Sequence, residues 1–214
     1  GLYGHPEWKR NGVAKQRSRN AGLLRQWAEL AGVGRPAPRE IKGLFTTPMT
    51  RVQEYAAING WGSHSTPSVL TNRSDADVQF LTLTIPARGV TVHPSPDQEV
   101  YVAWRSPLDG ELSLSGLVAD SDGSCGNGVA WRVEVMSAAG KTDVAGGTID
   151  NAGQQRFAPE EAVRVRQGDV ISLIVAARDK QHVCDTTHIA LTLSEIGGEN
   201  RKWDLAEDIV DRIL

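Results

Sequence analysis

The stretch Val100-Tyr-Val-Ala-Trp-Arg105 has the alternation that decides the fold. In an extended chain Val100, Val102 and Trp104 lie on one face, and the residues between them lie on the other. A period of two in residues that favour strands predicts a β-strand with one buried face. Pro107-Leu-Asp-Gly110 follows as a turn of the kind that joins paired strands. The stretch therefore predicts the start of an antiparallel sheet.

The same pattern of short extended segments continues on both sides of this stretch. It recurs at 78–85, 89–93, 112–118, 129–135, 144–149, 162–166, 170–176 and 187–194. Turns rich in Gly, Pro, Asp and Asn separate the segments, and no pattern of an ordinary helix lies between them. About eight to ten short strands with frequent turns are typical of a sandwich. We predict a mainly β protein, an antiparallel jelly-roll-like β-sandwich over about residues 67–196.

Helical patterns flank the predicted sandwich. Within 17–31, apolar residues recur with helical spacing at Leu23, Leu24, Trp27 and Leu30. A second apolar stripe starts after Thr47-Pro48 and ends at Gly60, which predicts another helix. We therefore predict a small helical and linker segment over 1–62. The C-terminal extension, 197–214, is predicted to be helical because apolar residues stand four apart at Leu205, Ile209 and Ile213.

Composition excludes several classes of partner. The chain has 214 residues, which fits one domain with a smaller appendage. Its net charge of -3 gives no electrostatic reason to expect nucleic acid or an anionic membrane as a partner. No apolar run approaches the length of a spanning helix, so we expect no membrane insertion. The chain starts at Gly1 without an apolar leader, and we interpret it as a piece of a longer protein.

The two cysteines, Cys125 and Cys184, both stand in polar loop sequence. One pair in a β-rich chain suits an oxidising compartment, and we predict a disulfide. Closing a loop of roughly 60 residues would stabilise the fold by about 4 kcal/mol in the chain-entropy model. Two unrelated free thiols remain the alternative. His182 and Cys184 alone do not make a zinc site, and the absence of Cys-x-x-Cys-His means that this segment attaches no c-type haem.

The loop around the first cysteine is dense in oxygen ligands. Asp120, Asp122 and Asn127, with Ser124, could bind Ca²⁺, which prefers several carboxylate and carbonyl oxygens. The spacing is not that of an EF-hand, because Trp131 stands where the closing Glu would be required. An ordinary polar loop tied by a disulfide is the alternative.

The loop around the second cysteine carries Arg178, His182, Asp185 and Thr186. If the cysteines are bonded, these residues meet Asn127 and form a polar rim at one end of the sandwich. Planar polar side chains of this kind hydrogen-bond pairs of sugar hydroxyls, so the rim is a candidate glycan site. The alternative is that these groups hydrogen-bond one another and anchor the two loops.

Aromatic residues give a second candidate surface. Trp104 and Trp131 share their strand faces with apolar residues, so we predict that both lie in the core. Tyr101 lies on the opposite strand face and is expected to be exposed, together with Arg105. A ligand would then bind on the face of the sheet, and the loop rim and the sheet face both stay open as sites.

Four motifs carry a resemblance. They are Val92-His-Pro-Ser-Pro96, Val102-Ala-Trp-Arg-Ser-Pro107, Cys125-Gly-Asn-Gly-Val-Ala-Trp131 and the segment Arg178 to Thr187. Over about 90–195 the chain resembles a segment of the large secreted planctomycete-type multidomain proteins that carry c-type cytochrome and associated paralogous domains. Such segments are also similar to carbohydrate-binding modules. The resemblance implies a secreted, periplasmic or cell-surface location and neighbouring domains of a parent chain as partners.

Three hypotheses for function follow. The first is a non-catalytic module that binds polysaccharide and holds its neighbours on the substrate. The second is a structural sandwich between domains, with an exposed Trp203 and the C-terminal helix as the contact surface. The third is a glycan-active hydrolase with an acid pair assembled in space. A Ser nucleophile elbow, a zinc helix and a phosphate-binding loop are all missing from the sequence.

Overall fold

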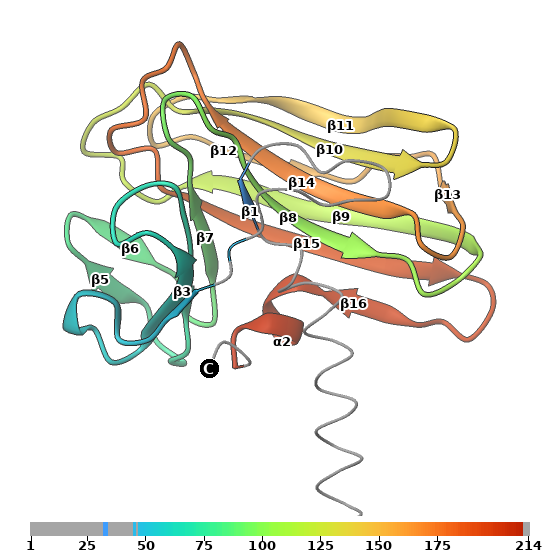
Figure 1. Ribbon diagram of the computed structural model, residues 1–214, viewed down its shortest axis with the longest axis horizontal. Coiled ribbons are helices and arrows are strands. Elements are labelled where there is room, and N and C mark those ends of the chain that lie inside the picture. Colours follow the sequence, from blue (N-terminus) through green and yellow to red (C-terminus); the bar gives the residue numbers. More distant parts are fainter. Residues whose placement is uncertain (1–31, 34–44, 46, 212–214) are drawn as a thin grey trace, which may run out of the picture.

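Two antiparallel sheets pack face to face in the computed structural model, which describes residues 32–33, 45 and 47–211 (Figure 1). The first sheet has the order β1 (Gly32–Val33), β8 (Val100–Arg105), β14 (Val170–Ala177), β10 (Val129–Ser137) and β11 (Gly140–Ile149). The second sheet has the order β12 (Gln154–Phe157), β9 (Gly110–Asp120), β15 (Thr187–Ile196), β7 (Val90–His93), β4 (Ser68–Asn72), β3 (Ile58–Gly62) and β2 (Pro48–Met49). At its margins β13 (Val163–Val165) pairs with β9, and β16 (Lys202–Asp204) pairs with β15.

The connections between the sheets are those of a jelly roll. The chain changes sheet at each step from β7 to β8, β9 and β10, and turns back in the β10–β11 hairpin. It then crosses to β12 and β13, which both pair with β9, returns to the first sheet at β14 and ends in the second at β15. As a result β8-β14-β10-β11 stands opposite β7-β15-β9-β12, which is the strand order of a jelly roll. The predicted antiparallel, jelly-roll-like β-sandwich is confirmed.

The main core fills the space between the two sheets. Trp104 is fully buried and Trp131 is 4% exposed, which confirms that both are core residues. Trp131 stacks on Phe157 with the ring centroids 4.8 Å apart, and this pair joins the first sheet to the second. The inward face of β8 is the one that its alternation predicts, because Val100, Val102 and Trp104 all belong to this core.

A smaller unit extends the second sheet beyond β7. We call residues 48–88 the annex: it holds β2, β3, β4 and a hairpin of β5 (Val78–Phe80) and β6 (Leu83–Ile85). Figure 1 shows β3, β5 and β6 beside β7 at one end of the sandwich. A separate set of buried side chains fills it: Met49, Val52, Ile58, Leu70, Phe80, Leu83 and Ile85. Alternation along β3 and β4 allows this, since Trp61 and Val69 pack into the main core from the same strands.

The helix predicted over 47–60 is wrong. Here the chain forms β2, the short 3₁₀ turn η2 (Val52–Glu54) and β3, with Pro48 paired to Trp61 and Met49 paired to Gly60. The apolar stripe is real, but pairing with β3 and packing in the annex override its helical spacing. The helix predicted within 17–31 lies outside the described residues.

The C-terminal helix is present, but it is short. It is α2 (Leu205–Ile209), and the Asp204 carboxylate caps it by accepting from the backbone N–H groups of Ala206 and Glu207. Trp203 precedes it in β16 and is 6% exposed, packed on Trp104 at 4.9 Å between ring centroids. The exposed Trp203 expected for an interdomain surface is therefore wrong. Among the described residues, no helix is long and apolar enough to cross a membrane.

Candidate functional site

A disulfide joins Cys125 to Cys184, as predicted, with a Cα–Cα distance of 5.5 Å. It ties the loop that leaves β9, residues 121–128, to the loop that enters β15, residues 178–186. We call these two loops the disulfide end of the sandwich. Every residue of the predicted rim and calcium loop lies in this end or at the adjoining strand terminus, so the sequence brought the right segments together.

Arg178 and Asn127 hold the two loops to each other. The Arg178 guanidinium donates to the Asn127 carbonyl oxygen at 2.9 Å and to the Asp150 carboxylate at 2.6 Å. In return the Asn127 side-chain amide donates to the Arg178 carbonyl oxygen at 3.2 Å. These contacts favour the alternative weighed above, in which this part of the rim anchors the loops.

Asp185 lies beneath the surface and is 1% exposed. Desolvation raises its pKa to about 6, against the opposing effects of the backbone N–H groups of Gly128 and Asn127 and of Arg178. Within the described part of the chain, neither carboxylate oxygen makes a hydrogen bond of standard geometry. The expectation that Asp185 stands on an exposed rim is therefore wrong, because the disulfide-linked loops close over it.

Thr186 and His182 meet a residue that the sequence analysis did not select as a site, His93. The Nε2 atom of His93 is 2.8 Å from the His182 carbonyl oxygen, and its Nδ1 atom is 3.0 Å from the Thr186 hydroxyl. Burial is the main cause that lowers the pKa of His93. Strand alternation explains its placement: in β7, Val90 and Val92 enter the main core, so Thr91 and His93 face the annex.

The predicted calcium ligands are engaged within their own loop. Asp120 accepts from the backbone N–H groups of Asp122 and Ala152 at 2.9 and 2.7 Å. Asp122 accepts from the Thr82 hydroxyl at 2.7 Å and from Ser124. In the described residues no cluster of three or more His, Cys, Asp or Glu side chains could hold a metal ion. These contacts give calcium no support, and its binding stays a prediction.

A cavity of about 400 Å³ lies where the annex meets the disulfide end. Its polar wall comes from Thr82 of the annex, His93 of β7, and Asp122 and Thr186 of the two loops. Thr91 also lines it; its hydroxyl is buried and has no hydrogen-bond partner in the described residues. The segment 63–66 also lines it. Among the pockets described, this is the one that the annex, the sandwich and the disulfide loops all line.

Two exposed apolar side chains border this cavity. Leu81 and Val183 are each 55% exposed, and both line it. Three lining residues, Gln53, Leu81 and Cys184, have φ of 49°, 55° and 63°, in the left-handed region that ordinary side chains rarely adopt. Strained backbone and exposed apolar surface concentrate at ligand sites, so the cavity is the candidate functional site.

The face of β8 that carries Tyr101 has less support as a binding site. Tyr101 is fully buried, and desolvation raises its pKa to about 12. The exposure predicted for Tyr101 is wrong. Alternation assigns residues to the two faces of β8, but it does not show whether either face is exposed to solvent, and here both are buried. Arg105 donates to the Gly168 carbonyl oxygen at 3.1 Å beside that strand. Neither residue lines the candidate cavity.

Three of the residues predicted for the site line the cavity: Asp122, Cys184 and Thr186. Arg178, Asn127, Asp185 and His182 belong to the supporting loops. The sequence analysis missed Thr82 and His93. His93 had a signal, since it ends an alternating strand just before Pro94, within a motif already singled out. Thr82 had none, because the annex was predicted without a role in binding.

Comparisons with known proteins place the chain in no family. No protein-family model matches it, and no curated protein matches it in sequence. The fold is similar to the CBM51 module of Clostridium perfringens GH95 in complex with methyl-galactose, with a TM-score of 0.37 and 12% identity over 67% of this chain and 96% of that one. An arabinose-bound GH51 α-L-arabinofuranosidase gives a TM-score of 0.41 and 12% identity over 81% of this chain and 28% of that one.

A third structure holds the M60 catalytic domain with two CBM51 domains of Clostridium perfringens ZmpB. It gives a TM-score of 0.33 and 7% identity over 69% of this chain and 25% of that one. Likeness at this level assigns neither family nor ligand to the chain. The candidate site therefore stands on its own residues, the cavity between the annex and the disulfide end.

Proposed function

We propose that this domain is a non-catalytic carbohydrate-binding module that holds a glycan in the cavity between the annex and the disulfide end. The observation that carries the proposal is the pairing of an apolar mouth with a polar wall. Leu81 and Val183 stand exposed at the mouth, and Thr82, Asp122 and Thr186 line the wall behind them. A sugar ring has the same two characters, with C–H groups on its faces and hydroxyls on its rim.

The energetics of the site support a ligand of that kind. An exposed leucine or valine gains up to about 1.5–3 kcal/mol when it is fully covered, and a sugar face covers part of it. The polar side chains of the wall can hydrogen-bond the hydroxyls on a sugar rim. The cavity of about 400 Å³ is of the size that small-ligand sites occupy.

The two alternatives have less support. An interdomain role was to rest on Trp203 and the C-terminal helix, but Trp203 and Ile209 are 6% and 1% exposed. A retaining or inverting glycosidase needs two carboxyl groups at the scissile bond. Asp122 is the one carboxylate among the described residues that line the cavity. The proposal is accordingly for binding without bond cleavage.

In the parent chain the module would act by proximity. A tethered binding domain raises the effective concentration of its neighbours on a polysaccharide without new chemistry. The disulfide fits a secreted, periplasmic or cell-surface location, which is part of the proposal. Any cytochrome-associated redox chemistry would belong to neighbouring domains.

A glycan-array screen of the oxidised protein, with and without calcium, tests the proposal. We expect selective binding that Leu81→Ala and Val183→Ala each weaken about three- to tenfold, since each removes part of the apolar mouth. Ile196→Ala is the matched control, because Ile196 is 48% exposed and does not line the cavity. Silence across neutral, amino, acidic and sulfated glycans would overturn the proposal. Equal losses in the control and the mouth variants would move the site elsewhere.

A further inference from the structure

The hydrogen-bond polarity of the cavity wall can be worked out atom by atom. A carbonyl oxygen only accepts, so the contact between His93 Nε2 and the His182 carbonyl fixes the proton on Nε2. Burial is the main cause that lowers the pKa of His93, which favours the neutral ring, and its Nδ1 atom is then an acceptor. The Thr186 hydroxyl must therefore donate to Nδ1. The Thr186 oxygen faces the cavity with lone pairs alone.

The same holds on the annex side of the wall. The Thr82 hydroxyl donates to the Asp122 carboxylate at 2.7 Å, so its proton is also committed. Desolvation raises the pKa of Asp122, but hydrogen bonds from Ser124 and Thr82 outweigh it and hold that pKa below its ordinary value. Asp122 is thus an ionised group that only accepts. We call Thr82, Asp122 and Thr186 the acceptor wall.

The charge of the site has the same sign as this polarity. Among the described residues that line the cavity there is no Lys and no Arg, and Asp122 is the one carboxylate. Asp122 is 4% exposed, and the Lys and Arg side chains of the annex and the two loops do not line the cavity with it: Arg51, Arg73, Arg88, Arg178 and Lys180. The basic group that acts on Asp122 is His93, whose pKa is lowered mainly by burial. With that ring neutral, the ionised carboxylate makes the cavity attractive to a cation and repels an anion.

We propose that the acceptor wall makes this site selective for amino sugars, whose protonated amine donates to Asp122, Thr82 and Thr186. An ammonium group has three N–H donors and no acceptor, which matches a wall that only accepts. N-acetylation replaces these donors with one N–H and a carbonyl acceptor, and a uronate or sulfate group adds a negative charge beside Asp122. This inference rests on the proposed carbohydrate-binding function and names the class of sugar.

The direct test compares two oligosaccharides of equal length, one of glucosamine and one of N-acetylglucosamine, by isothermal titration calorimetry at about pH 6. A large share of the glucosamine amines is protonated there, although the ring oxygens lower their pKa below that of an alkyl amine. We expect the amine form to bind about tenfold more tightly, and the preference to shrink as NaCl is raised. Equal affinities, or tighter binding of the acetylated form, overturn the inference and leave the proposed function standing. No binding of these or of any neutral glycan overturns both.

The charge of Asp122 is tested by Asp122→Asn, which keeps the size of the side chain. We expect this variant to lose the tenfold preference while it still binds the acetylated sugar. Asp179→Asn is the matched control, because Asp179 is an exposed carboxylate of the disulfide end that does not line the cavity. Circular dichroism checks the fold of both variants. A preference that survives Asp122→Asn, or that Asp179→Asn also removes, overturns the assignment to Asp122.

Discussion

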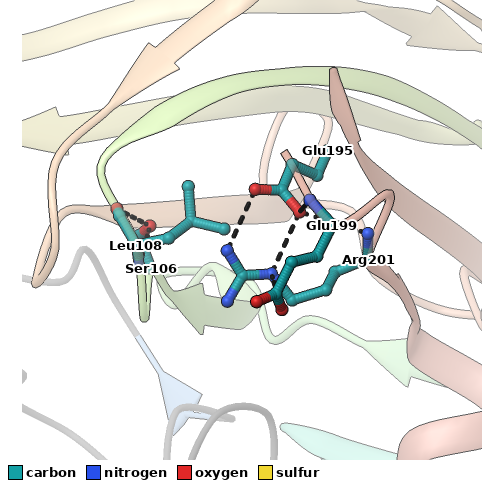
Figure 2. A network of polar contacts seen from close by, with 5 residues as sticks. All are labelled: Ser106, Leu108, Glu195, Glu199 and Arg201. Atoms are coloured by element: carbon teal, nitrogen blue, oxygen red, sulfur yellow. Dashed lines mark hydrogen bonds and ion pairs between the residues drawn. The ribbon is translucent and has the colours of Figure 1, made fainter. Parts of the chain in front are cut away.

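The strand β15 runs between two ends of the sandwich that are built in opposite ways. At its far end the turn 197–201 folds back onto Glu195, and Figure 2 shows the resulting clamp. The Glu195 carboxylate accepts from Nε and Nη2 of Arg201 at 3.0 and 2.9 Å, and from the backbone N–H groups of Glu199 and Arg201 at 3.2 Å each. Both oxygens of the Glu195 carboxylate therefore accept hydrogen bonds.

At the disulfide end, several buried polar groups make no standard hydrogen bond. The oxygens of Asp185 and the Asn127 side-chain oxygen are buried and make no hydrogen bond of standard geometry in the described residues, although the backbone N–H groups of Gly128 and Asn127 act on Asp185. The backbone differs as well. The far turn places Gly197, Gly198 and Asn200 at positive φ, which these residue types tolerate, whereas the rim of the cavity places Gln53, Leu81 and Cys184 there. The far end is a completed turn, whereas the rim of the cavity keeps backbone strain of the kind that clusters at functional sites, and the disulfide end keeps buried polar groups that lack standard hydrogen bonds.

Removing the disulfide should have the largest effect on this contrast. The bond closes a loop with a sequence separation of 59, and its loss in Cys125→Ser/Cys184→Ser should cost about 4 kcal/mol of the free energy of unfolding. Urea denaturation measures this, and glycan binding should fall with it because both loops line or support the cavity. Reducing agent added to the double variant is the control and should change nothing. A cost below about 1 kcal/mol would show that noncovalent contacts alone hold the disulfide end.

Asp185→Asn should remove the pH dependence of stability that the buried Asp185 carboxylate causes. The folded protein raises the pKa of Asp185 from 3.8 to about 6, so between these values the folded state holds a proton that the unfolded state has lost. Stability must then fall as pH rises through this window. We expect the wild type to lose about 2 kcal/mol relative to Asp185→Asn from pH 4 to pH 6. Denaturation series of both proteins across this range measure it, and parallel pH curves would contradict it.

Glu195→Gln at the far end should give the opposite pH dependence. Hydrogen bonds from the Arg201 side chain are the main cause that lowers the pKa of Glu195 from 4.5 to about 2. The stabilisation is therefore complete above 4.5 and is lost as pH falls towards about 2. Thermal unfolding should show a lower Tm for the variant at neutral pH and a gap that closes in acid. A gap that persists near pH 2 would mean that the clamp does not depend on charge.

Leu81→Asn should produce the smallest change, and it should be a gain. Asn adopts a positive φ with less strain than Leu, and Leu81 is 55% exposed, so little packing is lost. We expect about 0.5 kcal/mol of added stability, together with weaker glycan binding. Asn200→Leu at the far turn is the mirror experiment and should destabilise by a similar amount. If both substitutions destabilise, Leu81 contributes packing that outweighs its backbone strain.

The sequence was informative where local pattern and topology agree. Alternation in 100–105 predicted which face of β8 enters the core, and repeated short strands with frequent turns predicted a sandwich. The loops that carry Cys125 and Cys184 were correctly paired, because one pair of cysteines allows one disulfide. These features depend on residues close in sequence or on a simple count.

The rest depends on contacts that no local pattern encodes. The stripe at Met49 and Val52 suits a helix as well as a short strand and turn, and only the pairing with β3 decides between them. Tyr101 lies on the predicted face, but that face is buried. The acceptor wall joins Thr82, Asp122 and Thr186, which lie far apart in sequence and meet only after the sandwich closes. Sequence alone supplied two of these three residues and could not supply their arrangement.

The small core of the annex has a consequence for how often the cavity is fully formed. Its core is seven buried side chains, separate from the main core. A unit of this size opens locally at a lower free energy than global unfolding, so amide protons of β5 and β6 should exchange with solvent sooner than those of the central strand β14. Each such opening takes away the annex side of the cavity while the jelly roll stays folded. Under the proposed function, the lifetime of a bound glycan would depend on how often this small cooperative unit opens, and ligand should slow hydrogen exchange in the annex first.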